Sequence, residues 1–143
     1  MLNQIYKNLY LNIIHQNIRS LRKNFDFLIA NLLKLKVFPE IICLSETHIY
    51  DYETSLYSIN GYNHLSNCNN DYKCGGVSLF VKCNIINSYS CLNTLNADFL
   101  CVDINWNGKL FFIMCVYRLH SGTINGFISD LCLILENNKN KKI

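Results

Sequence analysis

The spacing of apolar residues changes near Gly61, and this change limits the folds open to the chain. Before it, an apolar run at 9–14, a helical pattern and a second apolar run at 41–44 predict a strand, a helix and a strand. After it, short β-prone runs alternate with breaks rich in Asn, Gly and Asp. A helical pattern then covers 122–136. Without an internal repeat or a linker, the 143 residues are predicted to form one α/β unit.

Local signals set the expected bounds of these elements. Ser20 can cap a helix from Leu21 to Lys36, and Pro39 ends that pattern. The Asn107-Gly108 dipeptide predicts a hairpin between two strands. The last helix is expected to bury the following residues: Phe127, Ile128, Leu131, Ile134 and Leu135. The expected later strands are 61–67, 75–82, 88–93, 99–105 and 109–117.

Composition favours a packed protein and excludes several classes. Half of the residues are hydrophobic, and only the polar tail at 136–143 is expected to be disordered. The eight cysteines form no CxxC pair, which argues against a disulfide or zinc framework, and several that lie in apolar runs, such as Cys43 and Cys115, are interpreted as buried thiols in a reducing compartment. With no secretory signal and no apolar run long enough to cross a bilayer, we expect a soluble intracellular protein.

The net charge of +3 is weak evidence for a nucleic-acid partner, because the basic residues form two loose groups instead of one concentrated face. The groups lie at 19–23 and 139–142. For the second group, ordinary solvated side chains are the better interpretation. For the first group, a solvated helix start is favoured over a DNA contact by a smaller margin.

Polar residues follow several expected strands, at the strand ends where α/β folds place their sites. Asn17 follows the first strand and Glu46 the second. The pair Gly75-Gly76 precedes a later strand, and Tyr117-Arg118 closes the apolar run FFIMCV.

Five short motifs in this order resemble the endonuclease/exonuclease/phosphatase superfamily, most closely the apurinic-type endonuclease domain of non-LTR retrotransposons. They are NIRSL at 17–21, LSETH at 44–48, GY at 61–62, GGVSLFV at 75–81 and YRLH at 117–120. The resemblance implies a partial four-layer α/β sandwich, mainly one mixed sheet with flanking helices, that occupies 1–143 as a truncated domain of this type.

The resemblance also implies a metal-dependent phosphodiesterase site that acts on DNA. It places a ligand of Mg²⁺, with Mn²⁺ as a substitute, on Glu46. Asn17 would orient the catalytic carboxylate and the phosphate, and Tyr117 would hydrogen-bond near the scissile phosphate. Arg118 could grip a phosphate on chemical grounds, and Arg19 is a second candidate for substrate binding. A complete retroelement protein would act on chromosomal DNA in the nucleus.

Each site residue also has a simpler interpretation. Glu46 could solvate a strand end, Asn17 could form a turn, and Tyr117 could lie at the edge of the core. The glycine pair is better explained by tight backbone geometry than by phosphate binding, since no P-loop lysine follows. The four histidines are expected to be structural or exposed, because none matches a catalytic position of the family: His15, His48, His64 and His120.

The motifs that complete the family's site, GDFN and SDH, are absent from the sequence. We therefore expect a fragment of a target-nicking endonuclease that is nearly inactive alone. Apolar strands such as LFFIMCVY are expected to lack a partner face, which would make the chain marginally stable and prone to self-association.

Two alternatives remain open: a non-catalytic interaction module of the same fold, and a phosphatase or repair nuclease. Arg19 favours the retrotransposon branch, because repair-type relatives often carry an acidic residue there. Leu119-His120 replace the prolines that the family carries after Tyr-Arg, so the loop is expected to be less rigid.

Overall fold

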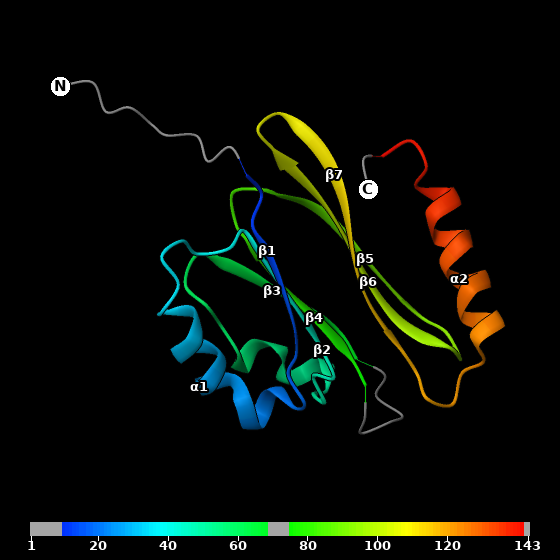
Figure 1. Cartoon of the computed structure of the whole chain (residues 1–143), viewed down its shortest axis with the longest axis horizontal. Coiled ribbons are helices and arrows are strands. Elements are labelled where there is room, and N and C mark those ends of the chain that lie inside the picture. The colour runs from blue at the N-terminus through cyan, green and yellow to red at the C-terminus, as the bar shows by residue number, and fades with distance from the viewer. Residues whose placement is uncertain (1–9, 69–74, 142–143) are drawn as a thin grey trace.

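The strands form two sheets that pack face to face between two helices in a computed structural model that describes residues 10–68 and 75–141 (Figure 1). The first sheet has the order β1-β2-β4-β3, and the second has the order β5-β6-β7. Helix α1 covers the outer face of the first sheet, and α2 covers the outer face of the second. The described residues therefore form a four-layer α/β sandwich.

The first sheet is mixed, because β1 and β2 are parallel while the other pairs are antiparallel. The parallel pair is joined by α1, Leu21–Leu32, which packs Leu21, Leu28 and Leu32 against the sheet. A short 3-10 helix, η1, follows β2 at Asp51–Leu56. The strands are β1 Ile13–Asn17, β2 Ile41–Ser45, β3 Tyr62–Asn67 and β4 Val77–Lys82.

The second sheet is an antiparallel meander whose central hairpin turns at Asn107-Gly108. Both residues have positive φ, 52° and 77°, as a two-residue hairpin turn with a right-handed twist requires. This hairpin confirms the prediction from the Asn-Gly dipeptide. The elements are β5 Ile86–Asn93, β6 Ala97–Trp106, β7 Lys109–Arg118 and α2 Ile124–Asn137.

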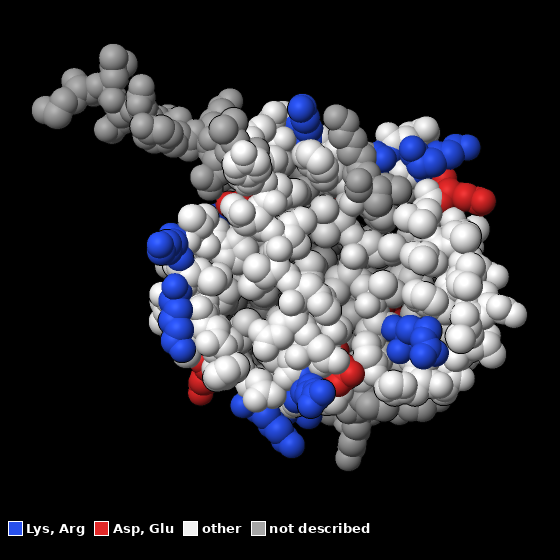
Figure 2. Space-filling model, viewed as in Figure 1, with Lys and Arg blue, Asp and Glu red and all other residues white. Residues whose placement is uncertain are grey.

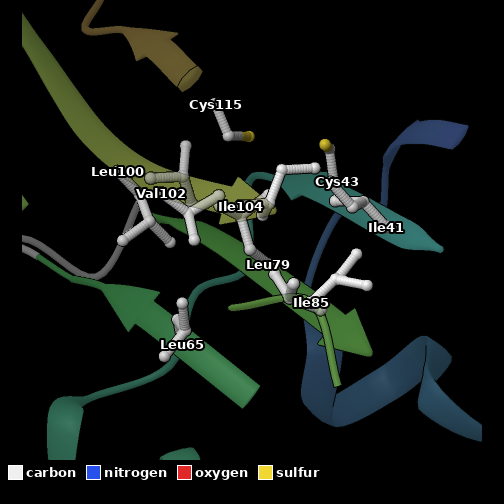
Figure 3. Close-up of a cluster of buried hydrophobic side chains, with 11 residues drawn as sticks. Ile41, Cys43, Leu65, Leu79, Ile85, Leu100, Val102, Ile104 and Cys115 are labelled. Atoms are coloured by element: carbon white, nitrogen blue, oxygen red, sulfur yellow. The ribbon is translucent and has the colours of Figure 1, made fainter. Parts of the chain in front are cut away.

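The largest core lies between the sheets. Alternate residues of β6 point inward, so Leu100, Val102 and Ile104 meet side chains of β2 and β4 from the first sheet. Figure 3 shows this cluster, with the Cys43 and Cys115 side chains projecting from opposite sheets into the space between them. The intervening residues of β6, such as Phe99, face α2 instead. Both faces of this strand are therefore buried.

Two expectations about the sheets need correction. The chain does not supply mainly one mixed sheet, because β5, β6 and β7 form a separate antiparallel sheet. The strand LFFIMCVY also does not lack a partner face. Cys115 packs in the core between the sheets, while Phe112 and Met114 pack beneath α2. Both faces of this strand are covered, so it offers no uncovered face for self-association.

Several element bounds differ from those expected. The first strand begins at Ile13, because pairing with Ile41 of β2 defines it. Helix α1 ends at Leu32 and not at Lys36, and Leu33, the first residue beyond it, is 70% exposed. Ser20 occupies the N-cap position without a side-chain capping bond.

At the other end of the chain, α2 includes Glu136 and Asn137, two residues assigned to the polar tail. Ile128 was expected to be buried by this helix, but it is 49% exposed. The seven described cysteines are free thiols, and Cys74 lies outside the described residues. No helix in 10–68 or 75–141 is long and apolar enough to span a membrane.

His64 of β3 is a structural histidine. Its ring stacks on Phe80 with a centroid distance of 4.1 Å, and its Nδ1 lies 2.9 Å from the carbonyl oxygens of Thr54 and Tyr57. Since both partners are acceptors, Nδ1 carries a proton and donates. Burial lowers the pKa of His64, although the two carbonyls oppose this shift. The neutral ring is therefore the form that the fold stabilises.

The lowered pKa predicts a loss of stability in acid. The unfolded chain binds a proton near the ordinary histidine pKa of about 6.5, whereas folded His64 binds it only at lower pH. Its stabilising contribution is present above that pH and is lost as the pH falls toward the folded pKa. Urea unfolding should show a steeper fall in stability from pH 7 to pH 5 for the wild type than for His64→Asn, which keeps a donor but does not titrate. Equal falls would contradict this prediction.

Candidate functional site

The carboxyl ends of β1 and β2 bring Asn17 and Glu46 to one edge of the first sheet. The strands are parallel, and Asn17 pairs in register with Ser45, the residue before Glu46. The two chains continue side by side beyond the sheet, because Ser20 N donates to Glu46 O at 2.8 Å. The two motifs expected to carry chemistry thus form one cluster of loops.

The backbone in this cluster is strained. Four of the five described non-glycine residues with positive φ lie here: Arg19, Ser20, Glu46 and His48, with φ of 48°, 88°, 55° and 52°. L-residues adopt this region at a cost of about 1–3 kcal/mol each, and such residues concentrate at functional sites. The two adjoining turns are held by tertiary contacts and not by local preference.

Gly75 and Gly76 supply the contacts on the other side of the Glu46 segment. Thr47 N donates to Gly76 O at 3.3 Å, and His48 N donates to Gly75 O at 3.1 Å. Both glycines have positive φ, and a Cβ on Gly76 would lie 2.6 Å from Thr47 Oγ1. The expected role of the glycine pair in tight backbone geometry is confirmed.

Tyr117 of β7 reaches the same edge from the second sheet. A Cβ on Gly75 would lie 3.3 Å from Tyr117 Cε1, so the ring contacts the glycine that holds His48. Cys115 lies two residues before Tyr117, and Leu44 lies two residues before Glu46. Cys115 Sγ donates to Leu44 O at 3.6 Å. Asn17, Glu46 and Tyr117 therefore lie on loops and strand ends that meet at one edge of the sandwich.

A buried carboxylate, Asp98, belongs to this group and was missed from the sequence. It lies opposite Tyr117 on β6, is 0% exposed, and accepts a bond from Gly76 N at 2.9 Å through Oδ2. Burial raises the pKa of Asp98, and the Gly76 bond opposes the rise. The sequence held a signal: the row that contains Leu100 and Val102 places an acid where an apolar residue belongs.

The two candidate arginines are placed differently. Arg19 is exposed, and its backbone N–H donates to Asn17 Oδ1 at 3.2 Å, which puts it in the Asn17 loop. Arg118 lies on the face of β7 opposite to Tyr117, and its guanidinium donates to the carbonyls of Leu119 and Gly122 at 3.3 and 3.4 Å. Arg19 therefore lies in the loop cluster of Asn17 and Glu46. The Arg118 guanidinium is bonded to the loop that follows β7.

Some of the simpler interpretations also describe what is seen. The Asn17 side chain closes a turn over Arg19, which is the turn-forming role considered above. His120 packs edge-on against the Tyr117 ring with a centroid distance of 6.2 Å. His48 and His120 thus lie beside the candidate site, although neither was expected to carry chemistry.

The residues present offer a partial fit to Mg²⁺. Magnesium in proteins is commonly held by one or two carboxylates, with water and substrate phosphate completing its shell. Of the candidate site residues, Glu46 is the one that could supply such a carboxylate. Within the described ranges no cluster of three or more His, Cys, Asp or Glu residues could hold a metal ion. The described residues therefore offer one candidate carboxylate ligand at this edge and no complete metal site.

The Lys and Arg side chains on the face drawn in Figure 2 are scattered. Figure 2 shows Lys and Arg side chains separated by broad uncharged surface on the face in view, without one dominant basic patch. Arg22 is paired with Glu53 and also lies 5.3 Å from the centre of the Tyr50 ring. Arg19 has no such described ion pair in the structure, so it is the more available cation of this loop cluster.

Comparison with known proteins supports the fold. No model of a known protein family matches the sequence, and no curated protein is significantly similar to it. Among solved structures, a humanized TDP2 from D. rerio aligns with a TM-score of 0.63 at 17% identity, over 90% of this chain and 59% of that one. D. rerio TDP2 complexed with a single-strand DNA product aligns with a TM-score of 0.61 at 12% identity, over 90% and 54%.

An AP endonuclease from Archaeoglobus fulgidus also aligns, with a TM-score of 0.52 at 18% identity, over 72% of this chain and 40% of that one. The chain thus spans less than two thirds of the length of each of these structures. At these identities the similarity concerns the fold. The chain has the α/β sandwich fold of the endonuclease/exonuclease/phosphatase type that TDP2 and this AP endonuclease share.

Proposed function

We propose that this chain is part of a Mg²⁺-dependent DNA endonuclease domain of the kind that non-LTR retrotransposons use to nick their target. The observation that carries the proposal is the meeting of Asn17, Glu46 and Tyr117 at one strained edge of the sandwich. The D. rerio structure with a single-strand DNA product supports DNA as the class of ligand for this fold.

The three residues have distinct roles in this proposal. Glu46 holds Mg²⁺, or Mn²⁺ as a substitute. The cation would neutralise charge on the phosphoryl oxygens. The Asn17 amide and the Tyr117 hydroxyl would orient the phosphate between the two sheets by hydrogen bonds. The sharp turn at Glu46, with φ of 55°, fixes the backbone that carries the metal ligand.

We expect this chain alone to bind DNA with little cleavage. The described residues contain no group of three or more His, Cys, Asp or Glu residues that could hold a metal ion, and the sequence has neither a Gly-Asp nor an Asp-His dipeptide to supply a general base or an imidazole. Loss of a single such group typically lowers the rate by about 10²–10⁴-fold.

Arg19 is proposed as a phosphate contact, and its removal should weaken DNA binding. The side chain is exposed beside Asn17, so Arg19→Gln removes a cation at the site edge without opening the core. We expect affinity for a DNA duplex at low salt to fall about threefold to tenfold. The slope of log affinity against log salt should shrink by about 1, the amount expected for one lost phosphate contact. Fluorescence anisotropy measures both quantities.

Lys109→Gln is the matched control, because Lys109 is an exposed cation in the hairpin of the second sheet. If both variants weaken binding equally, the effect comes from net charge and the DNA contact at Arg19 is wrong. If the wild type does not bind DNA, the result favours a non-catalytic module or a phosphatase of the same fold. Arg118→Gln should change binding less than Arg19→Gln, since its guanidinium is bonded within its own loop.

The retroelement origin has a separate test in the genomic DNA that follows the codon for Ile143. Reading all frames should reveal GDxN-like and SDH-like motifs if the gene encodes the rest of a target-nicking nuclease. That nuclease would act on chromosomal DNA in the nucleus. Their absence would favour an interaction remnant, and motifs of a repair nuclease would favour that branch instead.

A further inference from the structure

The inward row of β6 ends in a residue that the core does not explain. Leu100, Val102 and Ile104 are apolar and buried between the sheets, whereas Asp98 continues the same row with a carboxylate that is 0% exposed. A carboxylate buried in this way is costly unless other groups compensate it. Within the described residues, Oδ2 accepts from Gly76 N, and Oδ1 has no hydrogen-bond partner.

The described hydrogen bond of Asp98, to Gly76 N, lies at the joint between the two sheets. A Cβ on Gly75 would lie 3.1 Å from Asp98 Oδ2 and 3.3 Å from Tyr117 Cε1, both of the second sheet. A Cβ on Gly76 would lie 2.6 Å from Oγ1 of Thr47, in the segment that follows β2 of the first sheet. Neither glycine could carry a larger side chain without moving one of these neighbours. The pair is therefore held between Asp98 on one side and the Glu46 segment on the other.

The contacts continue from the glycines to the proposed metal ligand. Thr47 N and His48 N donate to the carbonyls of Gly76 and Gly75, and these two residues directly follow Glu46. Glu46 and His48 both have positive φ, so the turn between them depends on such outside contacts. A shift of the Gly75–Gly76 backbone would be passed to Glu46 through only two hydrogen bonds.

We propose that Asp98 is a positioning residue of the candidate site: by accepting from Gly76 N it fixes the Gly75–Gly76 turn, and that turn holds the segment carrying Glu46. This inference rests on the function proposed above. Asp98 need not touch metal or DNA in this role. It sets the direction of Glu46 in the way that residues behind metal ligands commonly do.

Two isosteric variants separate the acceptor from the charge. Asp98→Asn keeps the size and keeps an oxygen that can accept from Gly76 N. Asp98→Leu keeps the approximate size and loses the acceptor, but it extends the apolar row, so we expect it to fold. Asp103→Asn is the matched control, because Asp103 lies on the same strand and pairs with Lys141 and Ser88 instead.

The decisive readouts are amide hydrogen exchange at Thr47 and His48, and the dissociation constant of Mn²⁺ by electron paramagnetic resonance. In Asp98→Leu, exchange at both amides should become about tenfold faster, and Mn²⁺ binding should weaken about tenfold. Asp98→Asn and Asp103→Asn should stay within about twofold of the wild type in both measurements.

Unchanged amides and unchanged Mn²⁺ affinity in Asp98→Leu would overturn the proposal. Equal weakening in Asp98→Asn and Asp98→Leu would also overturn it, because charge and not the acceptor would then matter. If the wild type binds no Mn²⁺, the metal site itself is wrong, while the amide exchange still decides whether Asp98 positions the turn.

Discussion

Replacing Gly76 with alanine is expected to lower the free energy of unfolding by about 2–4 kcal/mol. Two separate effects contribute. Gly76 has φ of 83°, a conformation that costs an alanine about 1–2 kcal/mol. The new Cβ would also lie 2.6 Å from Thr47 Oγ1, a separation that real Cβ atoms do not tolerate. Thr47 is 0% exposed, so its side chain has little room to move away.

Gly61→Ala is the matched control for the conformational effect. Gly61 has nearly the same φ, 84°, but nothing lies within 4 Å of its would-be Cβ. Its substitution should cost only the backbone part, about 1–2 kcal/mol. Urea unfolding of both variants, with extrapolation to water, gives the comparison. Adding Thr47→Ala to Gly76→Ala should recover part of the loss, since it removes the clashing oxygen.

Equal costs at Gly61 and Gly76 would contradict this account of the joint between the sheets. They would mean that the Gly76 backbone relaxes freely and that Thr47 does not restrain it. The same result would weaken the inference about Asp98, because both arguments depend on a tightly packed Gly75–Gly76 turn.

Much of the fold could be predicted from local patterns. The start of α1 at Leu21, the strand at Ile41 and the hairpin at Asn107-Gly108 follow from periodicity and turn chemistry. The division into two sheets could not be predicted in the same way. Sheet membership depends on which strands pair over long distances, and the alternating pattern of β5, β6 and β7 does not encode their neighbours.

The candidate site shows the same limit. The positions of Asn17 and Glu46 at adjacent strand ends follow from parallel pairing, once that pairing is known. No local sequence signal describes the positive φ of Glu46, whereas the alternation that puts Asp98 in the same row as Leu100 and Val102 could have indicated its burial. Alternation alone could have placed Arg118 on the opposite face from Tyr117, since adjacent strand residues point to opposite faces.

Glu46→Gln is expected to have the largest effect on the proposed chemistry. The amide keeps the size and the hydrogen-bonding oxygen of the side chain but lacks the charge that a hard cation prefers. Mn²⁺ binding should weaken at least about tenfold, or about 1.4 kcal/mol. The fold should be preserved, because Glu46 is only partly buried and its backbone carbonyl, not its side chain, accepts from Ser20 N.

The matched control is Glu136→Gln, the same chemical change at an exposed position of α2, on the outer side of the second sheet. It should leave Mn²⁺ binding within about twofold of the wild type. A loss shared by both variants would show that the ion is attracted only by overall negative charge.

Paramagnetic broadening by Mn²⁺ in the amide spectrum of the labelled protein tests the central claim most directly, because it locates the ion as well as detecting it. We expect Mn²⁺ to broaden only the amide signals of the Asn17 loop, the Glu46–His48 segment and the neighbourhood of Tyr117. In Glu46→Gln this broadening should disappear. Broadening that is spread over other acidic residues, or that persists unchanged in Glu46→Gln, would contradict a metal-dependent phosphodiesterase site at this edge of the sandwich.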